Sequence, residues 1–300
     1  MEKTALRNRL TSGIFLFALF TVGCAVKQNS HNRAAIGSAY KTHEGGFTPH
    51  QKQLASQLCF KGMPQKTSEL LGPTEYVFRD GYVLEHSSVD KIPLWVCEDV
   101  KSSQLEGGAE RSNKFKTDPD LKGPHSTPTD YSRTGYDRGH QAPAGNQSHD
   151  QNLQDQTFFM SNMAPQLPKL NRNAWKSLEE QTRTWAKKYG EAYEFTGPIF
   201  YDPKEDDSST ATGTLSIDRI GTNSVSVPTH FYKIVIVQDG VAWKSIAFVM
   251  PNVSTYKSPY HLEKYIQSVR WIEQHTALNF MPELSAAESQ KLEAAASEMW

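Results

Sequence analysis

The sequence predicts an α+β protein with a central mixed, mainly antiparallel sheet and helices packed on its faces. Short runs of β-branched and aromatic residues, bounded by Gly, Pro and Asp, recur between residues 76 and 250 and are typical of strands. One segment, residues 173–189, instead spaces its apolar residues for one face of a helix. The 300 residues are 37% hydrophobic and 22% charged, which suits one or two globular domains and excludes disordered and collagen-like proteins.

The individual elements follow from local patterns along the chain. Residues 173–189 predict a helix that stops at Gly190, because glycine tolerates the backbone conformation that commonly ends helices. Strands are predicted where short apolar runs lie between turn residues, at 82–84, 93–97, 156–160, 193–200, 230–237 and 241–250. Strands therefore dominate the second half of the chain.

The amino terminus resembles an export signal. Three basic residues precede an apolar run at 14–22, which is shorter than the about 20 residues that a membrane-spanning helix needs. Residues 21–24 resemble a bacterial lipoprotein box, which predicts removal of a signal peptide at 1–23 and lipid attachment to Cys24. An alanine follows Cys24, where aspartate would favour the inner membrane, so we expect an outer-membrane lipoprotein that faces the periplasm or the exterior. An ordinary signal peptide is the alternative.

Three parts are expected after the signal peptide. Residues 24–50 are rich in Asn, Ser, Gly and His and predict a flexible tether to the membrane. Residues 51–284 carry the predicted strands and helix and form the globular domain. Residues 285–300 are rich in Ala and Glu and predict a helical tail at the carboxyl end.

The remaining cysteines, Cys59 and Cys97, form an even pair once Cys24 is set aside. Disulfides persist in the oxidising compartments outside the cytoplasm, so this pair predicts a bridge. Two buried free thiols, packed as small apolar groups, are the alternative.

Arg138 and His140 are separated by a single glycine and would point to the same face of an extended chain. Histidine can take a proton from water near neutral pH, and arginine can stabilise charge that develops on a phosphate. Taken alone, such a pair is more often a surface contact or an internally satisfied pair than a site. Its interpretation as a site depends on residues further along the chain.

Two further polar residues, Asn171 and Glu179, belong to the predicted helix and its start. Asn171 lies at the start of this helix and Glu179 about two turns later, close to one face. An amide oxygen is a hard ligand that suits Mg²⁺, an ion that keeps several waters and accepts phosphate oxygens. The alternatives are that Asn171 only caps the helix and that Glu179 is a solvated surface residue.

These groups lie in blocks that resemble the DNA/RNA non-specific endonucleases of the ββα-metal type. The similar blocks are DRGHQAP at 137–143, FMSNMAPQ at 159–166 and LNRNAWKSLE at 170–179, with further similarity in PLWV at 93–96 and VPTHFYK at 227–233. The resemblance implies a ββα-metal active-site motif and a Mg²⁺-dependent cleavage of DNA and RNA to 5′-phosphate products, with Mn²⁺ as a substitute ion. Several ordered blocks together are more specific than any one of them.

The resemblance also implies a role for each site residue. His140 is implied as the general base, Asn171 as the single protein ligand of Mg²⁺, Arg138 as a phosphate contact, Glu179 as a group that holds a water of the ion, Asn162 as an orienting amide, and Arg111 as an upstream phosphate contact. The register of the last assignment is open, because Lys114 lies in the same stretch.

The charge distribution agrees with a polyanionic substrate. Without the signal peptide the chain has 29 basic and 32 acidic residues, yet residues 111–188 hold twelve basic and eight acidic ones. This local excess predicts binding of DNA and RNA through the phosphate backbone. The alternatives are an inactive nucleic-acid-binding envelope lipoprotein on the same scaffold, and a zinc-dependent hydrolase that uses His125, His140 and His149.

Overall fold

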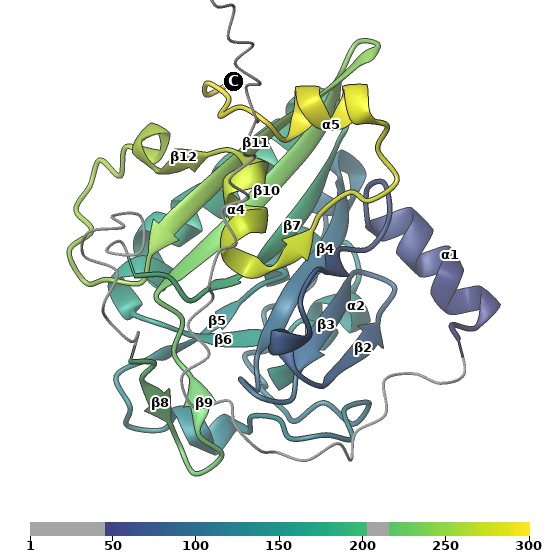
Figure 1. Cartoon of the computed structure of the whole chain (residues 1–300). Helices are drawn as coiled ribbons and strands as arrows, with labels where there is room; N and C mark the ends of the chain where they lie inside the picture. The colour runs from purple at the N-terminus through teal and green to yellow at the C-terminus, as the bar shows by residue number, and fades with distance from the viewer. Residues whose placement is uncertain (1–45, 203–215) are drawn as a thin grey trace, which may run out of the picture.

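The computed structural model describes residues 46–202 and 216–300, and its centre is a seven-stranded sheet (Figure 1). In spatial order the strands are β12 (Ile266–Gln267), β11 (Ala242–Pro251), β10 (His230–Asp239), β7 (Glu191–Ile199), β4 (Pro93–Lys101), β3 (Val83–Ser87) and β2 (Thr74–Phe78). Every neighbouring pair in this sheet is antiparallel. The α+β class and the mainly antiparallel sheet are confirmed, and the described strands of this sheet include no parallel pair that would make it mixed.

Five helices and three two-stranded ribbons accompany the sheet in the described residues. The helices are α1 (Pro49–Leu58), α2 (Gln151–Gln156), α3 (Lys176–Tyr189), α4 (Val269–Thr276) and α5 (Ala286–Leu292). The ribbons are β1 (Gln65–Lys66) with β13 (Leu278–Asn279), β5 (Asp137–His140) with β6 (Met163–Gln166), and β8 (Arg219–Ile220) with β9 (Val225–Ser226). None of the helices in these ranges is both long and apolar enough to cross a membrane.

The two faces of the sheet are distinct because neighbouring residues of a strand point to opposite sides. One face, which we call the α4 face, is covered by α1, α4 and α5, and α4 is drawn in front of the strands in Figure 1. Its buried residues include Cys97, Phe195, Tyr232 and Ile234. The opposite face, the α3 face, is covered by α3 and β6 and buries Phe231, Val235 and Phe248.

Most of the predicted elements occur close to their expected positions. Predicted strands at 193–200, 230–237 and 241–250 correspond to β7, β10 and β11. The predicted helix is confirmed, although a π-helical turn (Leu170–Trp175) leads into α3, and Gly190 ends it at a φ of +94°. The strand expected at 156–160 is wrong: α2 ends at Gln156, and a 3₁₀ turn (Met160–Asn162) follows, with only one isolated bridge, at Phe159.

Both ends of the predicted domain differ in detail from the expectation. Helix α1 begins at Pro49, and Thr48 caps it by accepting a hydrogen bond from the backbone of Gln51. The last two residues of the expected tether are therefore the first turn of a helix, whereas Cys24 and the signal peptide lie outside the described residues. At the other end, α5 spans only part of the expected tail, and Trp300 packs against Trp185 of α3.

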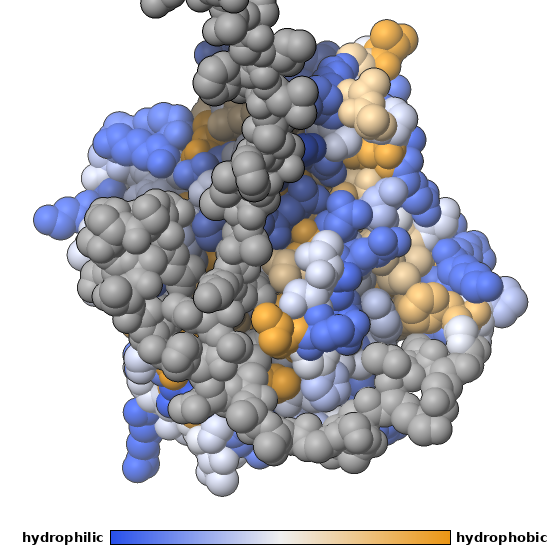
Figure 2. Space-filling model, viewed as in Figure 1, coloured by the Kyte–Doolittle hydropathy of each residue, from blue (hydrophilic) through white to orange (hydrophobic). Residues whose placement is uncertain are grey.

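A disulfide ties α1 to the α4 face of the sheet. Cys59, the residue that ends α1, is bonded to Cys97 of β4, with Cα atoms 5.3 Å apart. Both cysteines are buried in the same apolar cluster as Phe195 and Ile234. On the outside of this face, hydrophobic residues occur in scattered places among hydrophilic ones (Figure 2).

Candidate active site

A strand pair and a helix place the candidate residues on one ββα unit. Strand β5 pairs with β6, from Asp137 opposite Gln166 to His140 opposite Met163, and the π-helical turn and α3 follow β6. Gly139 allows this pair to pack tightly, because an added Cβ would lie 2.2 Å from Oε1 of Gln166. The unit therefore brings β5 against the start of the helix.

His140 lies at the end of β5 in an aromatic enclosure. Its ring centroid is 4.8 Å from that of Phe158 and 5.7 Å from that of Phe115, and the residue is 7% exposed. Burial, together with the positive charge of Arg111, lowers the pKa of His140 to about 3. The imidazole is therefore neutral at neutral pH. Its Nε2 is buried without a hydrogen-bond partner in the described part of the chain.

Two arginines lie against the aromatic rings that enclose His140. The Arg138 guanidinium lies 4.9 Å from the centroid of Phe115, and that of Arg111 lies 5.0 Å from Phe158. Arg138 donates to the carbonyl of Pro128 at 2.8 Å, and Arg111 donates to Oδ1 of its neighbour Asn113 at 2.9 Å. Neither guanidinium forms an ion pair with a carboxylate within residues 46–202 and 216–300, so both keep their charge available to an anion.

Asn171 is fixed by the first residue of β5. Its Nδ2 donates to Oδ2 of Asp137 at 2.9 Å, while Arg172 donates to both Asp137 oxygens at 2.8 and 2.6 Å. Burial raises the pKa of Asp137, but these hydrogen bonds outweigh it and hold the pKa below its usual range. Because an ionised carboxylate only accepts, the amide nitrogen must face Asp137, and Oδ1 of Asn171 is left without a donor in the described residues.

Strand β5 limits the distance between His140 and Asn171. Asp137 and His140 are three residues apart on β5, a span of about 10 Å at about 3.3 Å per residue. Asn171 is hydrogen-bonded to the first of them. The predicted base and the predicted metal ligand therefore lie on the same small unit rather than on separate parts of the molecule.

Glu179 lies two turns further, on the side of α3 that faces inward. Burial raises its pKa to about 7, against the opposing effects of Lys233 and Arg183. Arg111 also acts electrostatically on Glu179, as it does on His140, so one guanidinium lies close to both groups. Glu179 is therefore half-buried rather than a fully solvated surface residue.

Asn162 is fully buried and holds the chain that follows His140. Its Nδ2 donates to the carbonyls of Ala142 and Thr157, both at 2.9 Å, and its Oδ1 accepts from the backbone of Ala142 at 2.8 Å. These bonds occupy both amide protons. The side chain therefore fixes the backbone next to His140 and has no donor left for a substrate.

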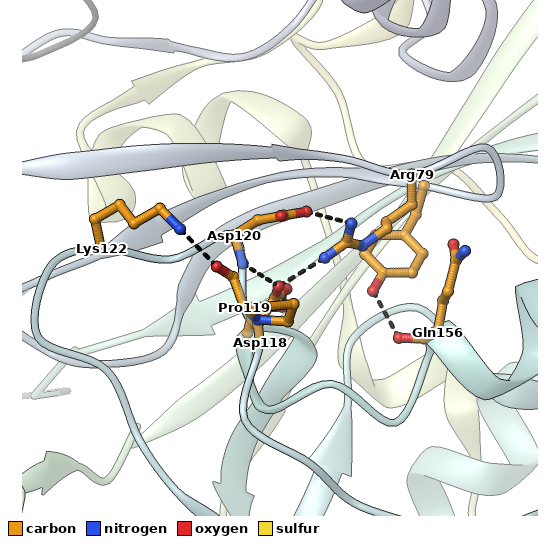
Figure 3. A network of polar contacts seen from close by, with 8 residues as sticks. Arg79, Asp118, Pro119, Asp120, Lys122 and Gln156 are labelled. Carbon is orange, nitrogen blue, oxygen red and sulfur yellow. Dashed lines mark hydrogen bonds and ion pairs between the residues drawn. The ribbon is translucent and has the colours of Figure 1, made fainter.

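An ionic network that the sequence did not predict supports the same region (Figure 3). Arg79, just after β2, donates to Asp118 at 2.6 Å and also contacts Asp120. The other oxygen of Asp118 accepts from Ser161 at 2.5 Å, directly before Asn162. Arg79 also lies 4.7 Å from the ring of Phe159. The network therefore connects the edge of the sheet to the turn that holds the histidine loop.

Other residues of the site also escaped the sequence analysis. Asp137 lies in the same sequence block as His140, DRGHQAP at 137–143, but its hydrogen bond to Asn171 forms only in the folded chain. Arg183 donates to Oδ1 of Asn146 at 3.3 Å and acts on Glu179 from one turn further along α3. Lys233 could have been singled out from the sequence, because a lysine within an apolar strand is buried only when it has a partner.

The three-histidine zinc site is not formed. No group of three His, Cys, Asp or Glu side chains in the described ranges is arranged to hold a metal ion. His140 packs against Phe158, whereas Nδ1 of His125 lies 2.7 Å from the carbonyl of Gly123. His125 is therefore engaged in its own loop.

Comparisons with known proteins show what this chain is similar to. A family model described as DNA/RNA non-specific endonuclease matches residues 61–287. Mitochondrial endonuclease G of Homo sapiens is 36% identical over 220 residues, which cover 72% of this chain and 73% of that protein. Nuclease C1 of Cunninghamella echinulata var. echinulata is also 36% identical over 220 residues, covering 71% and 85%.

The fold has a similar solved structure. A chain in the crystal structure of the EndoG/EndoGI complex superposes with a TM-score of 0.70 at 31% sequence identity. The alignment covers 82% of this chain and 96% of that one. The likeness therefore extends over nearly the whole described structure.

Proposed function

The chain belongs to the DNA/RNA non-specific endonuclease family, and we propose that it cleaves both DNA and RNA to 5′-phosphate products in a Mg²⁺-dependent reaction. Members of this family are typically metal-dependent hydrolases. The choice of Mg²⁺, with Mn²⁺ as a substitute, and the role of each residue are the parts of the proposal that require experiment.

One observation carries the assignment of the site. Asp137 takes the nitrogen of the Asn171 amide, which leaves the oxygen free in the described part of the chain. On the same strand, His140 is neutral, and the two arginines at its aromatic rings have no carboxylate partner among the described residues. A free amide oxygen, a neutral imidazole and unpaired positive charge are the groups that phosphodiester hydrolysis needs.

The ion would be held by Oδ1 of Asn171. An amide oxygen is a hard neutral ligand that suits Mg²⁺, and none of the residues that the structure describes donates to this atom. When bound, the ion supplies positive charge that stabilises the developing charge on the phosphate. Asp137 keeps the amide from rotating its nitrogen towards the ion, and Arg172 keeps Asp137 ionised.

His140 acts as the base in this scheme. Because Nε2 is buried, we assign the acceptance of the proton from the attacking water to Nδ1, with the ring proton held on Nε2. Arg138 and Arg111 would contact the phosphate from either side of the imidazole. Glu179 would accept hydrogen bonds from water at the site, and Asn162 would position the histidine loop without touching the substrate.

The same arrangement gives a reason for cleaving DNA and RNA alike, without discrimination between deoxyribose and ribose. The nucleophile is an external water, so the 2′-hydroxyl of RNA takes no part in the reaction. The proposed contacts of Arg138 and Arg111 are to the phosphate, which DNA and RNA share. Binding should accordingly weaken as the salt concentration rises.

The test is to incubate the purified protein with circular plasmid DNA and with RNA, in EDTA and after the addition of Mg²⁺, Mn²⁺ or Zn²⁺. We expect both nucleic acids to be cut only when Mg²⁺ or Mn²⁺ is present, with phosphate on the 5′ ends. Binding without cleavage in every condition would favour the inactive lipoprotein. Cleavage restored by Zn²⁺ alone would favour a different metal chemistry.

We also propose that the protein is attached to the outer membrane through lipid on Cys24. The support is the lipoprotein box at 21–24, which lies outside the described residues. Metabolic labelling with a radioactive fatty acid should mark the wild type but not Cys24→Ala, which should also leave the membrane fraction. Equal labelling of both proteins would contradict the lipid anchor.

A further inference from the structure

A buried carboxylate outside the proposed reaction, Asp130, joins two segments beside Arg138. Asp130 lies in a 3₁₀ turn (Pro128–Tyr131) and is 2% exposed. Its Oδ2 accepts from the backbone nitrogen and the hydroxyl of Thr127 at 2.7 and 2.8 Å. From Asn223, Oδ2 accepts from Nδ2 at 2.8 Å and Oδ1 accepts from the backbone nitrogen at 2.9 Å. The carboxylate therefore connects its own turn to a residue 93 positions further along the chain.

The same hydrogen bonds keep Asp130 ionised. Burial raises the pKa of this carboxyl, but the bonds from Asn223 and Thr127 outweigh burial and hold the pKa below its usual range. Hydrogen bonds to an ionised carboxylate are stronger than those between neutral groups. Removing a donor from Asp130 should therefore loosen the contact between the two segments.

The β8–β9 ribbon, whose turn carries Asn223, is itself anchored at the lower end of the molecule in Figure 1. Ser226 of β9 donates through its hydroxyl to Oδ1 of Asp90 at 2.9 Å and through its backbone nitrogen to the carbonyl of Asp90 at 3.0 Å. In the turn, Gly221 approaches Asp130 so closely that an added Cβ would lie 2.4 Å from the Cα of Asp130. The ribbon is therefore a fixed support for the 3₁₀ turn.

The 3₁₀ turn in its turn contacts the guanidinium of Arg138. Nη2 of Arg138 donates to the carbonyl of Pro128 at 2.8 Å, and Cζ of Arg138 lies 5.9 Å from the ring centroid of Tyr131. Nε of Arg138 is buried without a partner among the residues that the structure describes, so the terminal nitrogens carry the polar contacts of this side chain. Because the guanidinium is planar and rigid, the position of the Pro128 carbonyl limits how it can turn.

We propose that Asn223 is a positioning residue for Arg138: its hydrogen bonds to Asp130 fix the 3₁₀ turn whose Pro128 carbonyl orients the guanidinium for the phosphate. The proposal rests on the proposed function, because that function assigns Arg138 its contact with the phosphate. Both polar links are hydrogen bonds between identified atoms, and Asn223 itself is exposed, so its side chain can be changed without opening the core.

The variant that tests this chain of contacts most sharply is Asn223→Asp. It replaces the donor Nδ2 with a carboxylate that repels Asp130, whereas Asn223→Ala only removes the bond. With plasmid DNA and Mg²⁺, we expect kcat/KM to fall at least about tenfold in Asn223→Asp and about threefold to fivefold in Asn223→Ala. A wild-type kcat/KM in Asn223→Asp would overturn the proposal.

Thr222→Asp is the matched control. It adds the same negative charge to the neighbouring exposed residue of the same turn, so a general repulsion of nucleic acid would act in both variants. We expect kcat/KM of Thr222→Asp to stay within about twofold of the wild type. An equal loss in both variants would also overturn the proposal, because the effect would then follow from the added charge and not from Asp130.

A double-variant cycle with Arg138→Ala separates positioning from a general effect on the fold. If Asn223→Asp acts through the guanidinium, adding it to Arg138→Ala should lower kcat/KM by less than about twofold more. The same tenfold loss in both backgrounds would show that the effect does not pass through Arg138, and the proposal would fail.

A measurement on the protein without metal or substrate keeps this inference distinct from the proposed function. The bond to Pro128 restricts rotation of the guanidinium, so the Nη signals of Arg138 should be separate in ¹H–¹⁵N spectra of the wild type and of Thr222→Asp. We expect them to average in Asn223→Asp, and unchanged signals would contradict the positioning. If the signals average as expected but Arg138→Ala cleaves DNA as well as the wild type does, the positioning stands and the task of Arg138 in the proposed function is wrong.

Discussion

The two faces of the central sheet are built by the same strands but bury different chemistry. On the α4 face, β10 contributes Tyr232 and Ile234 to an apolar cluster that includes the disulfide. On the α3 face, the same strand places Lys233 between Phe231 and Val235, where its ammonium donates to Glu194 of β7. Only the second face supports the candidate active site.

The difference shows what the fold itself requires. The α4 face also buries a carboxylate, Glu85, but its partner Lys66 is part-exposed, whereas on the α3 face both Lys233 and Glu194 are fully buried. Burying charges costs free energy that their mutual attraction only partly returns. We therefore infer that the buried polar groups of the α3 face serve the site and lower the stability of the fold. The disulfide and apolar cluster of the α4 face are then the main source of stability.

The largest expected effect lies on the α3 side of the molecule. His140→Ala should lower kcat by about 10²- to 10⁴-fold, because a general base contributes about that much. The variant should still fold but be somewhat less stable, because alanine leaves a cavity where the buried imidazole packed against Phe158. Plasmid nicking and urea unfolding measure the two effects. His125→Ala is the control and should cleave normally; an active His140→Ala would refute the role of the base.

On the α4 side, the expected effect is on stability alone. Replacing both Cys59 and Cys97 with Ala should reduce the free energy of unfolding by about 2–4 kcal/mol, because the bridge restricts the unfolded chain. The kcat of the folded variant at low temperature should not change. Denaturant unfolding and nicking assays on the same sample test this division. A large loss of kcat with unaltered stability would contradict the assignment of stability to the α4 face and of activity to the α3 face.

The smallest effect concerns a carboxyl group on the α4 side. Burial raises the pKa of Glu273 to about 7 from its ordinary 4.5, although its Oε1 accepts from the backbone of Phe280. The folded state then binds this proton more tightly than the unfolded state does, so its contribution to stability is present below pH 4.5 and is lost as the pH rises to 7. The slope should stay below about 1.4 kcal/mol per pH unit, because Glu273 is part-exposed.

Glu273→Gln isolates this contribution. The difference in unfolding free energy between wild type and variant should change between pH 4.5 and 7, while their nicking activities change in parallel. A constant difference across this range would show that the carboxyl does not keep its proton in the folded protein.

The strands of the sheet could be predicted because their signal is local. The apolar runs at 193–200 and 230–237 are long enough to show which segments are extended, and β7 and β10 are found there. The order of the strands depends on contacts far apart in sequence, such as β4 with β7, and local patterns do not contain it. The run at 156–160 failed because its apolar residues pack in turns: Phe158, for example, is fully buried against His140.

The site was predicted in part for a similar reason. Arg138 and His140 lie close in sequence, so an extended chain already placed both on one face, and both contact Phe115. The fixing of Asn171 by Asp137, and the effect of Lys233 on the pKa of Glu179, arise only when β5 and β10 approach the helix. Sequence patterns identify reactive groups more readily than the groups that orient them.

The most direct test of the central claim is the Mg²⁺ requirement of two neighbouring asparagine variants. Asn171→Ala removes the amide that Asp137 orients, whereas Asn173→Ala changes the same helical turn without touching Asp137. We predict that Asn171→Ala abolishes nicking or raises the Mg²⁺ concentration for half-maximal rate by at least about tenfold, the loss of about 1.4 kcal/mol of binding. Asn173→Ala should follow the wild-type curve. Identical Mg²⁺ curves for all three proteins would show that Asn171 does not hold the ion.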